Sequence, residues 1–302
     1  MKVAILHHDL EYAERKIYEL FKKGNHEAFL IDIRNANIDD FGDVDLVLNR
    51  VYASVANRDY PSIKKTLELL KELEDRGVFC LNSYRTSFFD YDKYASFLSM
   101  KEKDIPTPKT IFINQDSINL DAVCKKLMKE LSFPMIIKRN IGGRGKDISR
   151  VGDINELLKD LENKFNNAIK ENYFGGFVAQ EFIKSNRDHD CRLGVIDGEV
   201  AFSYSRSLIS YGTKDPWLAS MTNGSVEGIY EAESEEKEIG LLASDSIGSR
   251  FNELDIMFSE EGPIIIENNP TPNYFDCAED IERIEAFVSK VEQSLLQSEI
   301  KI

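Results

Sequence analysis

Two carboxylates and one amide in the C-terminal part of the chain have the types and spacing of a metal site: Asp255, Glu267 and Asn269. Two apolar segments, FNELDIMF and PIIIENN, predict a pair of strands joined by a turn at residues 260–262. Side chains alternate faces along a strand, so Glu267 and Asn269 are expected to share one face. Oxygen ligands in this number suit Mg²⁺. The alternative is an exposed hairpin whose acidic residues lie in water.

The register of this hairpin decides whether the two carboxylates meet. A three-residue loop that ends in glycine is a common hairpin type, because its last position prefers positive φ. Such a loop pairs Ser259 with Pro263 and places Asp255 directly opposite Glu267. Asn268 then points to the other face, and the PTPNYF segment that follows has no explanation in metal binding.

A second segment has the composition of a phosphate-binding loop. MIIKRNIGGRGKDISRV predicts a strand, a glycine-rich turn and a second strand. The glycines would let backbone N–H groups approach phosphate oxygens and let the loop move as a lid. It is not a Walker A loop, since no Ser or Thr follows Lys146. Lys138 lies inside the apolar strand and is expected to need an anionic partner there; the alternative is a flexible hairpin tip whose lysine reaches water.

Two further strands carry candidate binding groups. FVAQEFI ends in a carboxylate and free backbone groups beside apolar side chains, which would suit the edge of an adenine ring, although most such segments are only strands. Arg192 and Arg206 lie in the strands that come next. Arginine in an alternating strand usually marks a half-exposed face, but two arginines that face a metal and phosphate would clamp anionic groups.

The first ninety residues alternate strand and helix signals. The strands are MKVAIL, EAFLID, DLVLNRV and VFCLN, and KKTLELLKELEDRG is a helix closed by glycine. This alternation predicts a parallel sheet flanked by helices, in which ligands bind beyond the carboxyl ends of the strands. Five polar residues fall at those ends, where strands also simply give way to polar loops: His7, His8, Asp9, Arg50 and Asn82.

Beyond residue 90 the pattern changes to helices interleaved with hairpins. Asp153 and Glu156 have the form of a capping box at the start of one helix, and the chain ends in an amphipathic helix with Ile284 and Val288 on its apolar stripe. We expect three parts: an N-terminal α/β domain over 1–90, a central part with the glycine-rich loop over 91–183, and a C-terminal part with the metal site over 184–302.

Composition excludes several classes of protein. The chain has 302 residues, 42% of them hydrophobic and 30% charged, as in an ordinary globular protein. A net charge of −15 argues against nucleic-acid binding. No apolar run approaches the ~18 residues of a membrane helix. The cysteines at 80, 124, 191 and 277 form no CxxC pair, so we expect reduced, mostly buried thiols in a cytoplasmic protein.

In this order the segments resemble the ATP-grasp superfamily, specifically the RimK-type carboxylate–amine ligases. The resemblance extends from about Asn82 to Phe275. It rests on NSYRTSFFDYDKYASFL with IPTPKT, on IIKRNIGGRGKDI, on AQEFI with DCRLGVIDG, and on DIMF with PIIIENNP. It implies an α/β protein with α+β lobes: an ATP-grasp fold with an N-terminal Rossmann-like parallel-sheet domain and the nucleotide between two further sheets.

The resemblance also implies roles for the matching positions. Asp255, Glu267 and Asn269 match the magnesium ligands, and Arg192 and Arg206 match the catalytic clamps on the acyl-phosphate. Glu181 would accept a hydrogen bond from the amino group of adenine. The positions implied to bind ATP are Lys93 and Lys138 at the phosphates, Gly142, Gly143, Arg144, Gly145 and Lys146 in the lid, Gln180, Glu181, Phe182 and Ile183 at the adenine, Asp190 near the ribose, and Asn223 close to the metal cluster.

The implied reaction joins a carboxylate to an amine through an acyl-phosphate and uses ATP with Mg²⁺, as two ions or with Mn²⁺ in their place. The expected partners are a small-molecule or peptide carboxylate and an amino acid or other amine, and the expected assembly is a homo-oligomer, a dimer or tetramer. A dipeptide or glutathione-like ligase, and a nucleotide-binding or carrier-binding module without turnover, are the alternatives. The sequence departs from the family at GGRGK, at PTPNYF and over residues 207–230, which leaves the substrate open.

Overall fold

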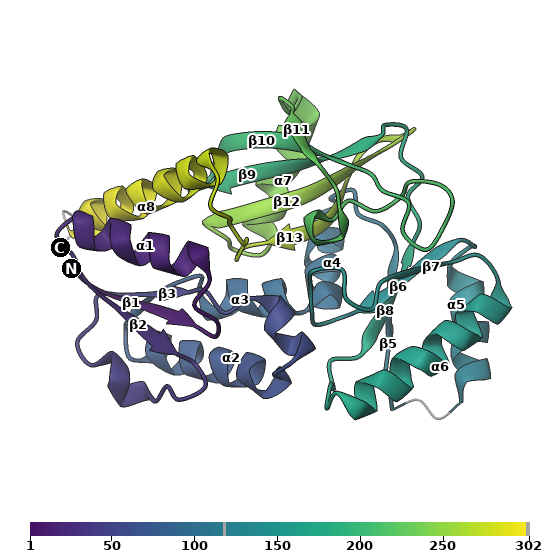
Figure 1. Ribbon diagram of the computed structural model, residues 1–302, viewed down its shortest axis with the longest axis horizontal. Coiled ribbons are helices and arrows are strands. Elements are labelled where there is room, and N and C mark those ends of the chain that lie inside the picture. Colours follow the sequence, from purple (N-terminus) through teal and green to yellow (C-terminus); the bar gives the residue numbers. More distant parts are fainter. Residues whose placement is uncertain (117–118, 300–302) are drawn as a thin grey trace.

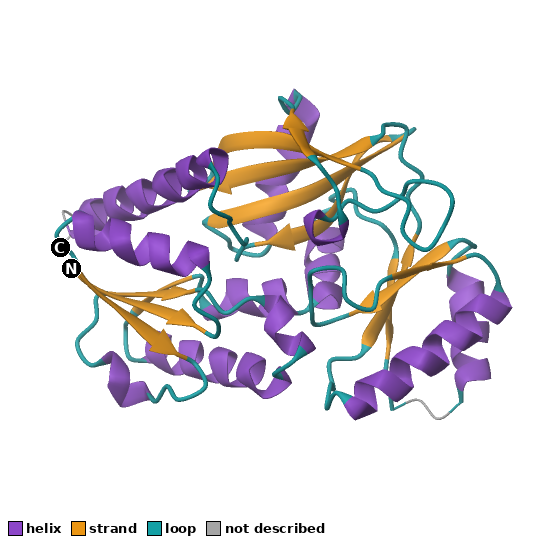
Figure 2. Cartoon of the chain, in the orientation of Figure 1, coloured by secondary structure: helices purple, strands orange, loops and turns teal. Residues whose placement is uncertain are grey.

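The computed structural model describes residues 1–116 and 119–299. Three sheets make up the molecule, one at the N-terminus, one in the middle of the chain and one in the C-terminal part (Figures 1 and 2). In the part of the chain that the structure describes, no helix combines the length and the apolar character needed to cross a membrane.

The N-terminal sheet is parallel, with strand order β2-β1-β3-β4. Its elements are β1 (Lys2–His7), α1 (Tyr12–Lys23), β2 (Glu27–Asp32), η1 (Ile38–Phe41), β3 (Leu46–Asn49), η2 (Ala53–Asn57), α2 (Tyr60–Asp75) and β4 (Phe79–Leu81). Residues 3–7 of β1 are all buried, as expected for a parallel strand that is covered on both faces. The strand β2 lies on one side of β1, and β3 and β4 lie on the other. The order of the strands therefore switches between β1 and β3, and the carboxyl ends of these two strands are where ligands bind in such sheets.

The central sheet is antiparallel, with order β5-β8-β6-β7. Its elements are α3 (Tyr84–Tyr91), α4 (Lys93–Glu102), β5 (Thr110–Ile113), α5 (Leu120–Glu130), β6 (Met135–Arg139), β7 (Ser149–Val151), α6 (Ile154–Lys170) and β8 (Phe177–Glu181). Half of the predicted capping box of α6 is confirmed, because the Asp153 carboxylate accepts hydrogen bonds from Asn155 N and Glu156 N at 2.8 and 3.0 Å. The Glu156 carboxylate accepts from Gly152 N at 2.7 Å and not from Asp153 N. The strands β6 and β7 flank the glycine-rich loop, as the sequence predicted.

The C-terminal sheet is antiparallel, with order β11-β10-β9-β12-β13. Its elements are β9 (His189–Ile196), β10 (Glu199–Ser207), η3 (Met221–Asn223), β11 (Glu227–Ile229), α7 (Ser234–Ser246), β12 (Phe251–Ser259), β13 (Gly262–Asn269) and α8 (Ala278–Glu299). The helix α7, which the sequence did not predict, covers one face of this sheet. It packs closely at Gly240, where a Cβ atom would collide with the Leu193 side chain.

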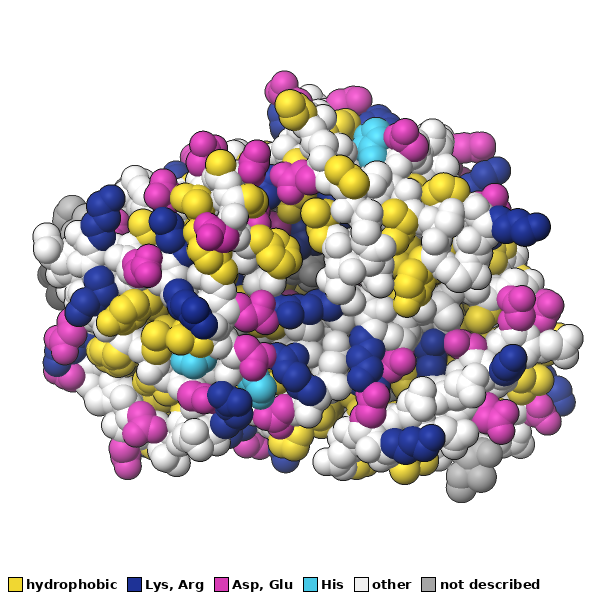
Figure 3. Space-filling view, in the orientation of Figure 1, with side chains coloured by type: hydrophobic (Ala, Val, Ile, Leu, Met, Phe, Trp, Pro, Cys, Tyr) yellow, Lys and Arg dark blue, Asp and Glu magenta, His cyan; other side chains and the backbone are white. Residues whose placement is uncertain are grey.

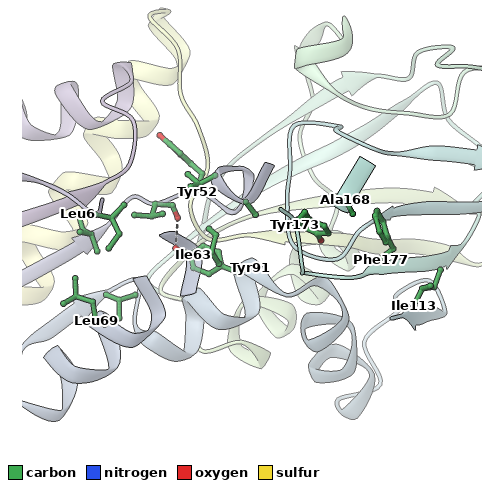
Figure 4. Packing of buried hydrophobic residues seen from close by; sticks show 14 of the residues in the cluster. Leu6, Tyr52, Ile63, Leu69, Tyr91, Ile113, Ala168, Tyr173 and Phe177 are labelled. Carbon is green, nitrogen blue, oxygen red and sulfur yellow. Dashed lines mark hydrogen bonds between the residues drawn. The ribbon is translucent and has the colours of Figure 1, made fainter. Parts of the chain in front are cut away.

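The apolar core joins these parts. One cluster continues from the N-terminal sheet into the central one and includes Leu6, Tyr52, Tyr91, Tyr173 and Phe177 (Figure 4). In a second cluster α8 lies along α1, so the two ends of the described chain meet (Figure 1). The cysteines at 80, 124 and 191 are buried and free, and the one at 277 is exposed and free.

The pairing predicted for the β12–β13 hairpin is wrong next to the turn, but the predicted pairing of Asp255 with Glu267 is confirmed. Ser259 pairs with Gly262, not with Pro263, so the loop has two residues. A β-bulge at Ile266 then adds one residue to β13, and Asp255 pairs with Glu267 as expected. The bulge reverses the alternation: Pro263 and Ile265 are buried before it and Asn268 after it, which leaves Glu267 on the opposite face.

Candidate active site between the central and C-terminal sheets

A deep cleft opens between the central and C-terminal sheets. Its inner cavity, of about 150 Å³, is lined by β6, β8 and the glycine-rich loop on one side and by β12 and β13 on the other. An outer cavity of about 580 Å³ shares part of this lining and extends to the N-terminal domain, where it meets Glu11, Tyr52 and Ser54. Basic and acidic side chains surround the hollow in the middle of the face in Figure 3. Every site residue that the family resemblance implied lines one of the two cavities except Asn223.

The three predicted metal ligands face this cleft together. Asp255 on β12 pairs with Glu267 on β13, and the next pair on the same face of the ladder joins Glu253 to Asn269. Asn268 points to the far face, where its side chain donates to Ser96 Oγ at 3.1 Å and accepts from Asn252 Nδ2 at 2.8 Å. The bulge at Ile266 is therefore the feature that directs Glu267 and Asn269 into the cleft.

The donor atoms of these residues fit a hard divalent cation. Glu267 Oε1 lies 3.0 Å from Lys93 Nζ, and Asp255 Oδ1 contacts two arginines. Over residues 1–116 and 119–299, no hydrogen bond reaches Asp255 Oδ2, Glu267 Oε2 or Asn269 Oδ1. One oxygen of each residue is thus uncommitted. Within the described chain no three His, Cys, Asp or Glu side chains lie close enough together to hold a metal ion. A site here therefore needs the Asn269 amide oxygen as a third ligand beside the two carboxylates.

The two arginines form a buried ionic cluster with Asp255. Arg192 donates through Nε to Glu253 Oε2 at 2.8 Å and through Nη1 to Asp255, while Arg206 pairs with Asp190 and lies 2.9 Å from Asp255. The pKa of Asp255 is lowered, because the charges of both arginines outweigh the effect of burial. The pKa of Asp190 is raised, because burial outweighs its pairing with Arg206. Asp190 is therefore engaged by Arg206 in this structure.

The two lysines approach the cleft from different elements. Lys93, at the start of α4, donates to the backbone oxygen of Gly142 at 2.5 Å and pairs with Glu267. Lys138, on β6, is only 8% exposed and makes no ion pair with any described residue, so the expected direct anionic partner is not found. Burial lowers the pKa of Lys138, and the nearby Glu267 and Asp255 charges only partly oppose that effect. A buried lysine without a partner suits an incoming anion.

The glycine-rich loop is tied to other parts of the protein. Arg144 donates to the Glu11 carboxylate at 2.7 Å, and Asn57 Nδ2 donates to Gly143 O at 2.9 Å, so both contacts reach the N-terminal domain. Lys146 pairs with Glu171 at 2.8 Å. Gly145 has a φ of +69° and lies against Asn223 Nδ2, where a Cβ atom would not fit. In this arrangement the loop lines both cavities of the cleft.

Apolar side chains line much of the inner end of the cleft. Gln180, Glu181, Phe182 and Ile183 line it from the end of β8, and the Glu181 carboxylate is turned outward to Lys109 N at 3.3 Å. Sequence reasoning missed the apolar residues that enclose this end: Ile136, Ile148, Trp217, Leu218, Met257 and Ile266. Trp217, the one tryptophan of the chain, was the available signal, but it lies in the region that matched the family loosely.

Several polar residues that the sequence offered as binding residues make structural contacts instead. Asn223 donates to Ser220 Oγ at 2.9 Å and lies on Gly145, not on the three metal-ligand candidates. Arg50 and Asn82, at the ends of β3 and β4, donate to the backbone oxygens of Pro272 and Pro270 at 2.6 and 2.7 Å. His8 contacts Asp59 at 3.0 Å, away from either cavity. The strand ends therefore support the segment that follows β13.

Asp90 is a site residue that sequence reasoning missed. It lies near the end of α3, lines the outer cavity and is 7% exposed. Its Oδ2 atom is buried without a hydrogen-bond partner in the described structure. Burial raises the pKa of Asp90 to about 7, although Thr271 and Lys93 oppose the shift. A neutral carboxyl group beside the metal-ligand candidates is therefore available in the metal-free protein.

Asp90 predicts a pH dependence of stability in the metal-free and nucleotide-free protein. Its pKa is about 7 in the fold and 3.8 in the unfolded chain, so between these values only the folded state keeps the proton. Stability therefore falls as the pH rises from about 4 to 7, by about 4 kcal/mol for a shift of this size. Asp90→Asn should remove this slope and be more stable than wild type at pH 8, but not at pH 4.

Urea unfolding in EDTA at both pH values measures the difference. Asp104→Asn, at an exposed position, is the matched control and should leave the slope unchanged. Equal stability of Asp90→Asn and wild type at pH 8 would show that the Asp90 carboxyl is not held neutral by its surroundings.

Three sheets with a cleft between the last two, closed by a glycine-rich loop, define the ATP-grasp class of nucleotide-dependent enzymes. Residues 90–287 match the family model of the RimK-like ATP-grasp domain. The chain belongs to this family. The predicted fold class and the resemblance stated from the sequence are confirmed.

Curated relatives agree with this classification. The glutamate–LysW ligase ArgX of Sulfolobus acidocaldarius is 28% identical over 242 residues, 78% of this chain and 80% of that protein. A probable alpha-L-glutamate ligase of Cellvibrio japonicus is 25% identical, over 90% of this chain and 88% of its own. The protein is an ATP-dependent carboxylate–amine ligase that uses ATP with a divalent metal, and its substrates are a carboxylate and an amine.

Solved structures show the same fold. D-alanine–D-alanine ligase from Bacillus anthracis superposes with a TM-score of 0.69 at 19% identity, covering 100% of this chain and 98% of that one. The RimK domain protein of Sphaerobacter thermophilus gives 0.68 at 18%, covering 96% and 97%. At these identities the likeness concerns the fold alone.

Proposed function

We propose that the protein joins an amino acid, through its amine, to the carboxylate of a second substrate in two steps at this cleft. The observation that carries the proposal is the convergence of Asp255, Glu267 and Asn269, each with an uncommitted oxygen, on the cleft. Asp255 and Glu267 line both of its cavities, Asn269 lines the outer one, and Lys93 and Lys138 line the inner one. Bound there, two Mg²⁺ ions would neutralise the charge that develops on the transferred phosphoryl group. Asp255, Glu267 and Asn269 would hold them.

In the first step, an oxygen of the substrate carboxylate attacks the γ-phosphorus of ATP. The bond from that phosphorus to the bridging oxygen breaks, and ADP leaves. Lys93 and Lys138 would hold the phosphates in line, since phosphoryl transfer depends on positioning and charge and needs no nucleophilic side chain. The lid of residues 142–146 would keep water from the reactive acyl-phosphate.

In the second step, the amine nitrogen attacks the acyl carbon, phosphate leaves and the nitrogen loses a proton. Arg192 and Arg206 border the outer cavity beside Asp255, where they would bind the anionic acyl-phosphate. Arg192 would bind the acyl-phosphate through Nη2, because Nε and Nη1 already donate to Glu253 and Asp255.

We propose glutamate as the first amino acid to test, because the two curated relatives above carry it in their names. The outer cavity of about 580 Å³ reaches the N-terminal domain and has room for a second substrate at its mouth, a small molecule or the end of a peptide or carrier protein. The segment 270–275 lines this mouth through Thr271, Pro272, Asn273 and Phe275, so we place recognition of that substrate there.

The test is to incubate the protein with ATP, Mg²⁺ and each amino acid in turn, with and without a cell extract, and to follow ADP and conjugates by mass spectrometry. ADP with a glutamate conjugate supports the proposal. A product made from two free amino acids would point to a dipeptide ligase. Without ADP release under any condition, a nucleotide-binding or carrier-binding module would be the better account.

Further properties belong to the same proposal. We propose a homo-oligomer, a dimer or tetramer, for which the exposed Ile169 and Phe174 offer apolar surface. Light scattering would test it. The buried free thiols support a cytoplasmic location. We also keep the division at residues 90 and 183 into three structural parts, and we expect Mn²⁺ to replace Mg²⁺.

A further inference from the structure

The PTPNYF segment after β13, which metal binding did not explain, is fastened to two parts of the molecule. On the N-terminal side, Arg50 Nη2 donates to Pro272 O at 2.6 Å, and Tyr52 OH, which also contacts Glu14 Oε1, lies 3.2 Å from Asn273 Oδ1. The Tyr274 ring is buried in the apolar cluster that includes residues of β1, α1 and α8. The segment around Tyr274 is therefore attached to the N-terminal domain.

On the other side, the Tyr274 hydroxyl reaches the cluster of arginines. It donates to Glu253 Oε1 at 2.6 Å, and Arg192 Nε donates to Glu253 Oε2 at 2.8 Å. Glu253 is only 1% exposed, and both of its oxygens are engaged by these two groups. Burial and the Glu253 charge raise the pKa of Tyr274, so its hydroxyl stays a donor.

This chain of contacts fixes the Arg192 guanidinium in one orientation. Glu253 holds Nε and Asp255 holds Nη1, which leaves Nη2 without a hydrogen bond to any described residue. Arg192 lines the outer cavity, whereas Glu253 and Tyr274 line neither cavity. We propose that Glu253 and Tyr274 are positioning residues that orient Arg192 toward the anionic intermediate, and that the segment 270–275 links this orientation to the N-terminal domain. The catalytic part of the proposal rests on the proposed function of Arg192.

The chain offers a matched control for the tyrosine. Tyr230 forms a Tyr–Glu–Arg trio elsewhere in the C-terminal part, with Glu236 buried and Tyr230 half-buried: its hydroxyl donates to Glu236 at 2.8 Å and accepts from Arg187 at 2.6 Å. None of these three residues lines the cleft. Tyr230→Phe therefore removes a hydroxyl group from a Tyr–Glu–Arg trio and leaves the contacts of Arg192 unchanged.

The first measurement does not depend on activity. In a spectrum of arginine Nε–H groups in ¹⁵N-labelled protein, one protected signal should vanish in Arg192→Lys and so identify Arg192. In Tyr274→Phe this signal should exchange with water at least about 10-fold faster, because Glu253 has lost one of its two partners. Tyr230→Phe should leave it unchanged. Unaltered exchange in Tyr274→Phe overturns the positioning role, whatever reaction the protein catalyses.

The second measurement is a mutant cycle on ADP formation. Tyr274→Phe and Glu253→Gln should each lower kcat about 10-fold with the KM for ATP unchanged, as is common for residues that support a ligand-binding group. In an Arg192→Ala background, Tyr274→Phe should have no further effect. Equal losses in both backgrounds would mean that Tyr274 acts elsewhere. Wild-type kcat in Arg192→Ala would instead refute the proposed function of Arg192, and the catalytic part of this inference with it.

Discussion

The Glu267→Gln variant is expected to form ADP at least about 100-fold more slowly than the wild type, the loss that removal of one preorganised electrostatic group usually causes. Gln keeps the volume of the side chain, but it removes the charge that a divalent cation needs and leaves Lys93 without its partner at 3.0 Å. The initial rate of ADP release in saturating ATP and Mg²⁺ measures the effect.

The β12–β13 hairpin supplies the control for this variant. Glu261→Gln makes the same chemical change at an exposed turn position six residues earlier, and we expect it to retain full activity. Both variants should unfold cooperatively with similar midpoints, because neither side chain supports the core. Wild-type turnover in Glu267→Gln would refute the metal assignment.

Lys138→Met is expected to stabilise the metal-free protein and to weaken ATP binding by about 10- to 100-fold, the loss of a charge-assisted bond worth about 1.5–3 kcal/mol. The two effects have one cause. Lys138 is buried on β6 with a lowered pKa and without an ion pair among the described residues, so its charge costs free energy until an anion arrives. Calorimetric titration with ATP and a thermal melt measure the two effects.

Lys164→Met tests whether any buried lysine would behave in this way. Lys164 is buried on α6 of the same central part, but it pairs with Asp160 at 2.8 Å and donates to Ser149 Oγ at 2.9 Å. Its loss should lower stability and leave ATP affinity unchanged. An unaltered affinity of Lys138→Met for ATP would count against the phosphate role.

The sequence was informative where the contacts are local. Asp255 and Glu267 lie twelve residues apart across one turn, so strand alternation and a turn glycine were enough to place them opposite each other. The same pattern predicts a three-residue loop, whereas the hairpin has a two-residue loop and an unpaired Ile266, which together give the same pairing of Asp255 with Glu267. Because the three residues before Glu267 are all isoleucine, the sequence does not show which of them is left without a partner on β12.

The remainder of the site depends on how distant segments pack. Arg144 meets Glu11 across 133 residues, and Arg50 meets Pro272 across 222. Asp90 gives no signal in the sequence, because its raised pKa comes from burial that only the assembled fold provides. The family resemblance supplied residue roles, but none for Glu253 or Tyr274, which became visible only through their hydrogen bonds.

The bulge on β13 has a consequence for how this site tolerates insertions and deletions. Deletion of Ile266 would remove the bulge, yet it would keep Asp255 opposite Glu267 and leave Glu267 and Asn269 in the cleft. A strand of the present length that paired without the bulge would instead turn Glu267 and Asn269 toward α7 and place Asn268 in the cleft. The acidic pair is thus specified by the unpaired residue as well as by residue identity, and an alignment with a bulge-free relative that omitted the gap at this position would equate residues that lie on opposite faces of the sheet.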